Sequence, residues 1–331
     1  MIISRTPFRI SFFGGGTDYP AWYEHHGGAV VAAAINRYCY ISCRCLPPFF
    51  AHRFRIAYSQ LETASTVEEI RHPAVRACLQ FLNINKGLEI HHDSDLPKQT
   101  GLGTSSAFAV GLLHSLHRLL GQDVPPMQLA LEAIRVEREL CKERVGSQDQ
   151  VTAAIGGLNR LDFPPHGEIK TTPLMLPPDR LSAFTRHLML YFTGFSRFAS
   201  EVVVEQLNNM PGKEKEMREM MAMVDAAINI LRDSTCDLRT FGALLHESWR
   251  LKRSLSSRIS SALIDDIYKT ARDAGALGGK LCGAGGGGFM LLFVEPEKQL
   301  AVESALARFL RVPFEIDLNG SQIIFQEQEQ L

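Results

Sequence analysis

The chain has 331 residues, of which 45% are hydrophobic and 21% are charged. These values are ordinary for a soluble globular protein, and the length suffices for two domains, or for one large domain, with an ample core. A formal net charge of −1 gives no reason to expect binding to nucleic acid or attraction to a membrane surface.

The seven cysteines are scattered, and no Cys-x-x-Cys pair occurs. This argues against a disulfide framework and favours a reducing compartment. The N-terminal segment lacks the apolar run of a signal peptide, and the sequence has no run of about 18 apolar residues. We therefore expect a cytoplasmic protein that does not span a membrane. The sequence leaves the oligomeric state open, a homodimer included.

Alternating apolar and polar residues predict a first strand over residues 7–13, in which Phe8, Ile10 and Phe12 share one face. Three glycines end this strand. The elements predicted next are, in order, strands over 29–35 and 38–45, a loop over 95–106, helices over 105–120, 129–141 and 148–155, and a strand over 158–163.

A proline-rich segment, residues 176–179, is the best candidate for a domain boundary, so we expect domains over 1–178 and 179–331. Strands and helices are mixed irregularly, which favours an α+β fold over a regular βαβ array. The elements predicted after the boundary are a strand over 187–192, helices over 200–208, 213–233, 238–254 and 261–274, strands over 280–282 and 288–294, and a last strand over 314–317 or 322–326.

The most informative segment is Gly-Leu-Gly-Thr-Ser-Ser-Ala at residues 101–107, because an apolar helical pattern follows it directly. Glycines allow a close backbone approach, and hydroxyl residues are favoured at helix N-caps. The first N–H groups of a helix are unpaired and lie at its positive end, so this loop suits a phosphate group. The Gly-Lys-Ser/Thr ending of a Walker A loop is absent.

A second glycine loop, residues 283–288, formally matches the Rossmann pattern G-x-G-x-x-G. A Rossmann loop precedes a helix, whereas residues 289–294 have the pattern of a buried strand, so this interpretation fails. A flexible hairpin loop is the simplest alternative. Because ordering many glycines costs much entropy, close approach of the backbone to a ligand is the favoured explanation.

Two acidic residues stand at the ends of predicted elements. Asp18 follows the strand and its three glycines, where it could bind sugar hydroxyls or simply make an Asx-type turn. Asp149 falls in the first turn of a short helix. Its carboxylate could bind a ligand, or it could simply be favoured by the positive end of the helix. Ser147 and Gln150 have the spacing of a capping box around it.

Glu137 interrupts the apolar stripe of the helix predicted over 129–141. A buried carboxylate needs a partner, so we expect a metal cation or an arginine nearby. Basic residues also cluster in the second half of the chain. Arg197, Lys252 and Arg253 could bind a substrate phosphate, or could belong to a solvated basic face.

Three glycine loops and an aspartate in this order resemble the GHMP kinases, which include galactokinase, homoserine kinase, mevalonate kinase and phosphomevalonate kinase. The first family motif is similar to residues 6–19 and the third to residues 280–289. The second is similar to Pro97 and residues 101–107, with Thr104 in place of a serine. The resemblance implies an N-terminal ATP-binding domain like domain 2 of ribosomal protein S5 and a ferredoxin-like C-terminal domain, with the site between them.

The resemblance also implies roles for individual residues. Asp149 would be the catalytic base, with Arg9 beside it, and Ser106 and Glu137 would hold Mg²⁺. The residues that would bind ATP are Pro97, Gly101, Leu102, Gly103, Thr104, Ser105 and Ser106. The residues that would bind the substrate are Gly15, Gly16, Thr17, Asp18, Gly283, Gly285 and Gly286, with Arg197, Lys252 and Arg253 as candidates for a substrate phosphate.

Within the family, Gly-Gly-Gly-Thr-Asp in place of the galactokinase Gly-Glu-His-Thr-Asp resembles heptose-phosphate kinases and fucokinases. Residues 147–150 and 283–289 are also similar to those of D-glycero-D-manno-heptose 7-phosphate kinases. This implies ATP-dependent phosphorylation of the anomeric hydroxyl, on a route to nucleotide-activated heptose for bacterial surface polysaccharide. The alternatives are a fucokinase-like or other sugar 1-kinase, a decarboxylase of the mevalonate branch, and a non-catalytic sensor of sugar or ATP.

Overall fold

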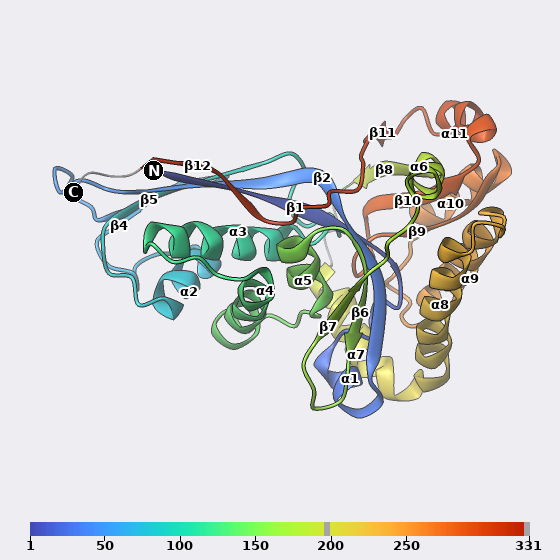
Figure 1. Cartoon of the computed structure of the whole chain (residues 1–331), viewed down its shortest axis with the longest axis horizontal. Coiled ribbons are helices and arrows are strands. Elements are labelled where there is room, and N and C mark those ends of the chain that lie inside the picture. Colours follow the sequence, from blue (N-terminus) through green and yellow to red (C-terminus); the bar gives the residue numbers. More distant parts are fainter. Residues whose placement is uncertain (195–198, 328–331) are drawn as a thin grey trace.

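The first sheet is built around one long strand. The computed structural model describes residues 1–194 and 199–327, and in this part of the chain eight strands form the sheet, in the order β12-β1-β2-β5-β3-β4, with β6 paired to β2 and β7 paired to β6 (Figure 1). The strands are β1 (Ile2–Phe13), β2 (Gly28–Cys45), β3 (Phe54–Ala57), β4 (Leu61–Ala64), β5 (Leu88–Ser94), β6 (Leu158–Phe163), β7 (Lys170–Pro173) and β12 (Gln322–Gln326).

Strand β2 is continuous where the sequence predicted two strands. It pairs with β1 along its length, with β6 near its start and with β5 near its end. The register of the β1–β2 ladder shifts between Pro7 and Phe8, opposite Tyr38 and Ile35. This irregularity absorbs the two residues that interrupt the alternating pattern. The prediction of a break there was therefore wrong.

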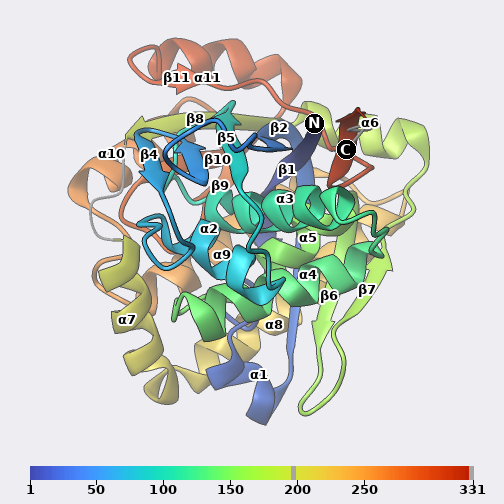
Figure 2. The ribbon, with the colours of Figure 1, turned by 90° about the vertical axis from the view of Figure 1, so that its left-hand side faces the viewer.

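Helices cover one face of this sheet (Figure 2). They are α2 (Pro73–Phe81), α3 (Thr104–Leu119), α4 (Pro126–Arg135) and α5 (Gln148–Ile155), while α1 (Pro20–His26) follows the first glycine loop. Helix α3 is buried along most of its length and packs against β1 and β2. The single helix predicted over 129–141 is interrupted: α4 ends at Arg135 and a π-helical turn, Val136–Leu140, follows.

The second sheet has the ferredoxin-like strand order that the family resemblance implies. Its strands are β8 (Leu188–Gly194), β9 (Ala276–Leu281), β10 (Gly288–Val294) and β11 (Leu310–Arg311), in the antiparallel order β11-β8-β10-β9. The glycine loop at residues 283–287 joins the neighbouring strands β9 and β10. It is a hairpin loop, and the rejection of a Rossmann motif is confirmed.

Of the helices of the second part, α9 and α10 pack against β9 of this sheet, whereas α8 packs against α9 and against β1 and β2 of the first sheet. The helices of this part are α6 (Pro178–Arg186), α7 (Ala199–Asn209), α8 (Glu214–Arg232), α9 (Arg239–Ser254), α10 (Ala262–Asp273) and α11 (Gln299–Ala305), with 3-10 turns at Met210–Gly212 and Pro296–Lys298. Among the described residues, no helix is long and apolar enough to cross a membrane.

The end of the described chain returns to the first sheet, where β12 pairs with β1 (Figure 1). Of the two alternatives for the last strand, 322–326 is therefore correct, while Ile316 forms only an isolated bridge with Ile35. A division at residue 178 consequently does not separate the two sheets completely. We retain 1–178 and 179–331 as a proposed division, with β12 as a return to the first part.

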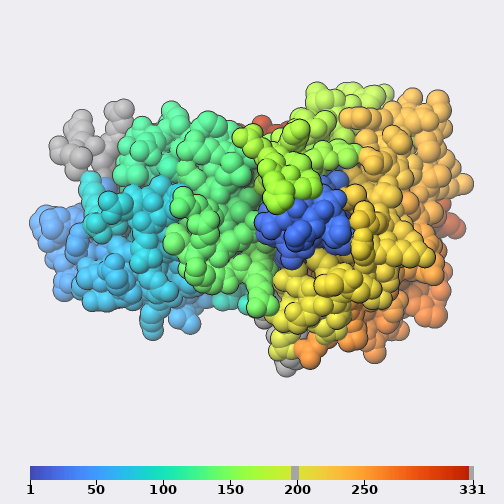
Figure 3. All heavy atoms as spheres, turned by 90° about the horizontal axis from the view of Figure 1, so that it is seen from below, coloured from blue at the N-terminus to red at the C-terminus, as the bar shows by residue number. Residues whose placement is uncertain are grey.

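The segment around α1 lies between the two halves of the molecule. In Figure 3 its dark-blue atoms reach the surface between the green hairpin β6–β7 and the yellow helices α7 and α8. Trp22 on α1 is buried in a cluster with Met217 and Met220 of α8. The first glycine loop, immediately before α1, is therefore held between the halves.

Four buried phenylalanines join the two sheets: Phe12 on β1, Phe184 on α6, Phe241 on α9 and Phe293 on β10. The ring centroids of Phe184 and Phe241 lie 4.9 Å apart, and those of Phe241 and Phe293 lie 5.3 Å apart. Phe12 contacts Phe184 edge-on at 5.5 Å, a preferred arrangement of aromatic rings. The two sheets thus share one core.

We predict that Phe241→Ala lowers the free energy of unfolding by about 3–5 kcal/mol, because it removes a fully buried ring from this shared core. Urea denaturation followed by circular dichroism measures the change. Phe49→Ala is the matched control, since this ring is 90% exposed, and it should change stability by less than about 0.5 kcal/mol. Equal effects of the two substitutions would contradict the shared core.

Candidate active site

A buried arginine ties together three parts of the fold. Arg9 on β1 donates from Nε to Oδ1 of Asp149 and from Nη2 to Oδ2, each at 2.7 Å. Its Nη1 donates to the carbonyl oxygen of Gly101 at 2.7 Å. Burial alone would lower the pKa of Arg9, but the Asp149 carboxylate raises it above its ordinary value. The pair is therefore ionic, and it fixes Asp149 relative to the phosphate loop.

Asp149 keeps access to solvent within this arrangement. Its side chain is 24% exposed, whereas that of Arg9 is 6% exposed. A Cβ atom on Gly103 would lie 3.2 Å from Oδ2 of Asp149, so only a glycine fits beside the carboxylate without displacing it. The structure thus brings together the two residues expected to act in catalysis and the glycine loop expected to bind phosphate.

Asp18 is buried at the start of α5, next to Asp149. Its Oδ1 accepts a hydrogen bond from the N–H of Gly16 at 3.0 Å, and its Oδ2 accepts one from the N–H of Gln148 at 3.3 Å. Burial and the nearby Asp149 carboxylate raise the pKa of Asp18. A Cβ atom on Gly146 would lie 1.9 Å from Oδ2, which explains the glycine there. Asp18 therefore caps α5.

The capping box predicted at α5 does not form. Ser147 is the N-cap residue, but it makes no side-chain cap hydrogen bond. Its hydroxyl accepts a hydrogen bond from Nη2 of Arg138 at 2.7 Å, and the Gln150 amide donates to Glu137 instead. The carboxylate of Asp18 supplies the cap. This partner lies 130 residues earlier in the chain, so a local pattern could not reveal it.

The predicted phosphate loop does open a helix, although a glycine takes the N-cap position. Gly101 and Gly103 have φ values of +81° and +72°, which disfavour other residues, and α3 begins at Thr104. Ser105 is exposed and Thr104 half-buried, whereas Leu102 is buried under the loop. The unpaired N–H groups of the first helical turn therefore lie beside Asp149, where they suit an anion. Pro97, at the start of the loop, is exposed.

The second and third glycine loops pack directly against each other. A Cβ atom on Gly101 would lie 2.4 Å from the carbonyl oxygen of Cys282, and one on Gly283 would lie 2.4 Å from Cα of Gly101. Gly285 is similarly close to the backbone of Ile259. Close approach to other backbone, not only to a ligand, therefore explains these glycines. Contact of Gly283, Gly285 and Gly286 with a substrate stays a prediction.

Of the first glycine loop, Thr17 is buried and structural. Its hydroxyl donates to the carbonyl oxygen of Gly14 at 2.8 Å and accepts from the N–H of Ala29 at 3.1 Å. Gly16 is buried, with a φ of +106°, whereas Gly15 is only partly buried. Gly15 is therefore the residue of this loop that borders solvent.

Glu137 and Ser106 meet in the core beside the phosphate loop. Ser106 Oγ donates to Oε2 of Glu137 at 2.8 Å, and Gln150 donates to the same oxygen. Glu137 is 2% exposed, and its Oε1 has no hydrogen-bond partner among the described residues. Burial raises its pKa to about 7, although both hydrogen bonds act against this. The predicted burial of Glu137 is confirmed.

Glu137 lies in the π-helical turn that ends α4. Such turns are frequent at functional sites. Within the described ranges, no group of three or more histidine, cysteine, aspartate or glutamate residues could hold a metal ion. A cation at Ser106 and Glu137 would therefore rely on these two residues together with oxygen atoms from a bound ligand.

Lys252 is buried and already bonded. Its Nζ donates to the carbonyl oxygens of Leu281 at 3.0 Å and of Gly283, so it holds the glycine loop. Burial lowers its pKa well below the ordinary value. Lys280 was not predicted; its Nζ donates to the carbonyl oxygen of Phe12 at 3.0 Å, and burial lowers its pKa to about 8. The one indication in the sequence is that this lysine lies in a short predicted strand, residues 280–282.

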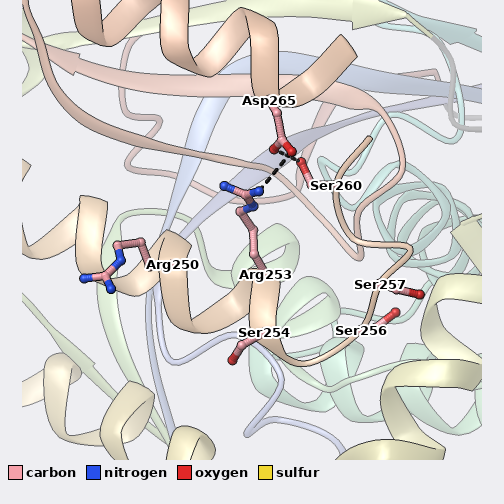
Figure 4. Close-up of a pocket in the computed structure, with 7 residues that line it drawn as sticks. All are labelled: Arg250, Arg253, Ser254, Ser256, Ser257, Ser260 and Asp265. Carbon is pink, nitrogen blue, oxygen red and sulfur yellow. Dashed lines mark hydrogen bonds and ion pairs between the residues drawn. The ribbon is translucent and has the colours of Figure 1, made fainter. Parts of the chain in front are cut away.

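Arg253 lies in a different environment from Lys252. It borders an open pocket of about 440 Å³ and pairs with Asp265 at 2.9 Å, while Arg250 points away from this pair (Figure 4). The loop that carries Ile259 forms one wall of this pocket and accepts a hydrogen bond from the N–H of Gly286 at 3.0 Å. Arg197, the third candidate for a substrate phosphate, lies outside the described residues.

Comparison with known proteins gives consistent matches over both halves of the chain. The models of the GHMP kinases N terminal domain and of the GHMP kinases C terminal domain match residues 67–157 and 223–312. The D-glycero-alpha-D-manno-heptose 7-phosphate kinase of Campylobacter jejuni is 30% identical over 319 residues, which are 93% of either chain. The bifunctional fucokinase/GDP-fucose pyrophosphorylase of Arabidopsis thaliana is 24% identical over 87% of this chain and 29% of its own.

Solved structures share the fold. A D-glycero-D-manno-heptose 1-phosphate kinase from Bacteriodes thetaiotaomicron aligns with a TM-score of 0.79 and 22% identity, over 99% of this chain and 100% of the other. The expected fold, with its two characteristic domains, is confirmed. Kinases of this family use ATP, and the chain is a phosphotransferase with an alcohol group as acceptor. It belongs to the GHMP kinase family.

Proposed function

We propose that the chain transfers the γ-phosphoryl group of ATP to the anomeric hydroxyl of D-glycero-D-manno-heptose 7-phosphate. The product is the 1,7-bisphosphate, which would supply nucleotide-activated heptose for bacterial surface polysaccharide. The observation that carries this proposal is the 30% identity to a heptose 7-phosphate kinase over 93% of both chains. The geometry around Asp149 supports the chemistry.

Phosphoryl transfer through a loose transition state depends on positioning and charge neutralisation more than on a strong base. Arg9 holds both carboxylate oxygens of Asp149 in one orientation, and the carboxylate stays partly exposed. Asp149 orients the acceptor hydroxyl and accepts its proton as the new bond forms. The glycine loop at residues 101–106 binds the ATP phosphates through the first N–H groups of α3.

Ser106 and Glu137 have the properties expected of a Mg²⁺ site. Hydroxyl and carboxylate oxygens are the hard ligands that Mg²⁺ prefers. Glu137 Oε1 is buried without a hydrogen-bond partner, which a cation would provide. When bound, Mg²⁺ neutralises the charge of the ATP phosphates. We propose that these two residues hold it.

The position of the substrate phosphate is a separate part of the proposal. Lys252 is bonded to the glycine loop. Arg253 is exposed, pairs with a single carboxylate and borders a pocket lined by serines (Figure 4). The wall of this pocket contacts the third glycine loop through Ile259. Of the two described candidates, Lys252 and Arg253, we therefore propose Arg253 as the residue that binds a distal phosphate.

We predict that Asp149→Asn lowers kcat by about 10²–10⁴-fold with heptose 7-phosphate, because it removes a positioned proton acceptor. ATP binding, measured by calorimetry, should persist. Asp179→Asn is the matched control, since Asp179 is an exposed acid in the first turn of α6. Near-normal turnover by Asp149→Asn, or loss of ATP binding in place of turnover, would overturn the assigned role.

We predict that an ATP-consumption assay with a panel of acceptors gives the highest kcat/KM for D-glycero-D-manno-heptose 7-phosphate. The panel includes the unphosphorylated heptose, L-fucose, D-galactose and mevalonate. A preference for the unphosphorylated sugars would favour a fucokinase-like enzyme. If no acceptor were turned over while ATP and sugar still bound, the non-catalytic sensor would replace the kinase.

We predict that Glu137 makes the metal-free protein less stable as the pH rises from about 4.5 to about 7. In this window the unfolded chain releases the Glu137 proton while the folded chain keeps it, since the folded pKa is about 7. The unfolding free energy thus falls by up to about 1.4 kcal/mol per pH unit. Glu137→Gln removes this contribution and weakens the stabilisation by Mg²⁺ and ATP.

Denaturant titrations at several pH values measure this dependence. Glu139→Gln is the control, because Glu139 lies in the same turn but its side chain is 61% exposed. The difference in pH slope between wild type and Glu137→Gln isolates the one carboxyl group. Equal slopes for wild type and both variants would show that Glu137 does not titrate in this range.

A further inference from the structure

Two buried polar side chains next to the Arg9–Asp149 pair have unused hydrogen-bonding atoms. Ser11 is 8% exposed and Gln148 is 7% exposed. Within the described part of the chain, Ser11 Oγ and Gln148 Oε1 have no hydrogen-bond partner. Buried polar groups in native proteins are nearly always bonded, so an unpaired pair beside a catalytic site calls for an explanation.

Ser11 and Gln148 lie on the same two elements as Arg9 and Asp149, which are strand β1 and helix α5. Ser11 follows Arg9 by two residues on β1, so both point to the same face of the strand. Gln148 precedes Asp149 at the start of α5, where its N–H is bonded to Asp18. Strand β1 and helix α5 pack together. Ser11 and Gln148 thus lie along the same interface between β1 and α5 as the Arg9–Asp149 contact.

Gly15 lies against both of these side chains. A Cβ atom on Gly15 would lie 3.1 Å from Ser11 Oγ and 3.7 Å from Gln148 Nε2. Gly15 is partly exposed, although Gly14 and Gly16 on either side are buried. Gly15 therefore borders both solvent and the two polar side chains, and any larger residue at this position would crowd Ser11 Oγ.

We propose that Ser11 and Gln148 bind the acceptor hydroxyl that neighbours the phosphorylated one, which is the 2-hydroxyl of an aldose. This inference rests on the proposed sugar kinase activity and names two residues that determine its specificity. The 2-hydroxyl donates a hydrogen bond to Gln148 Oε1 and accepts one from Ser11 Oγ, so both unpaired atoms gain a partner. A hydroxyl group is the fitting ligand because it donates and accepts at once.

Ser11 and Gln148 should affect the recognition of the acceptor sugar more than the binding of ATP. A site built to bond a substrate hydroxyl disfavours an analogue that lacks it, because the protein atoms are then left unpaired. The neighbouring hydroxyl also fixes the rotation of the sugar, so that its anomeric oxygen faces Asp149. Ser11 and Gln148 are therefore positioning residues whose effect should appear in kcat/KM for the sugar.

The test compares wild type, Ser11→Ala and Gln148→Met with D-glycero-D-manno-heptose 7-phosphate and with its 2-deoxy analogue. The wild type should lose about 10- to 100-fold in kcat/KM when the 2-hydroxyl is absent, since one or two hydrogen bonds are lost. Each variant should be slower with the natural acceptor and should discriminate between the two acceptors less than wild type does, because one of the two hydrogen bonds to the 2-hydroxyl is already missing. The KM for ATP should not change.

Stability measurements separate a binding role from a structural one. Because the two atoms are unpaired in the free protein, Ser11→Ala and Gln148→Met should leave the melting temperature unchanged or raise it. Ser248→Ala is the control, since Ser248 is a buried serine on α9 with an equally unpaired Oγ; it should likewise leave the melting temperature unchanged or raise it, but it should not change the kinetics. A melting temperature lowered by several degrees in Ser11→Ala would overturn the proposal.

The outcomes distinguish this inference from the function on which it rests. If wild type does not phosphorylate the heptose 7-phosphate, the proposed function fails, and the same comparison is made with the panel sugar that is phosphorylated and its 2-deoxy form. If the variants discriminate between the two acceptors as strongly as wild type does, the hydroxyl is bound elsewhere and the inference is wrong.

Discussion

The site depends on the guanidinium group of Arg9. A buried charge is costly unless it is paired, and Arg9 on β1 gains its partners from two other segments, the start of α5 and the loop before α3. These bonds set the distance between the carboxylate of Asp149 and the helix end that suits phosphate. Folding and the geometry of the site are therefore specified by the same contacts, and Gly103 can be no larger without disturbing them.

Periodicity predicts the long elements well but not the contacts that join them. Helices α3 and α8 and strand β10 follow their sequence patterns closely. The continuity of β2 was missed because two residues of β2, Asn36 and Arg37, interrupt its alternating pattern at a register shift against β1, and β12 joins its sheet from more than 300 residues away. Local patterns contain no information about such partners, which only the packed chain supplies.

The residues of the site likewise fall into two groups, those that the local sequence pattern reveals and those that only the packed chain reveals. Glu137 was recognisable because a carboxylate in an apolar stripe is anomalous within its own helix. Lys280, Ser11 and Gln148 are ordinary in their local sequence, and their significance arises from burial and from the partners that they have or lack. Similarly, the glycine loops were recognisable as places of close approach, but the sequence could not show that Gly101 and Gly283 approach each other.

The hydrogen bonds that Asp18 accepts affect which side chains are available to bind the acceptor sugar. Both of its oxygens accept hydrogen bonds from backbone N–H groups, and it is 1% exposed. Its carboxylate is thus engaged in holding the start of α5, and through α5 in placing Asp149 and Gln148. A substitution at Asp18 would shift all of these groups together. Beside Asp149, Ser11 and Gln148 each retain a buried hydrogen-bonding atom with no partner among the described residues, and we propose that they discriminate among sugars.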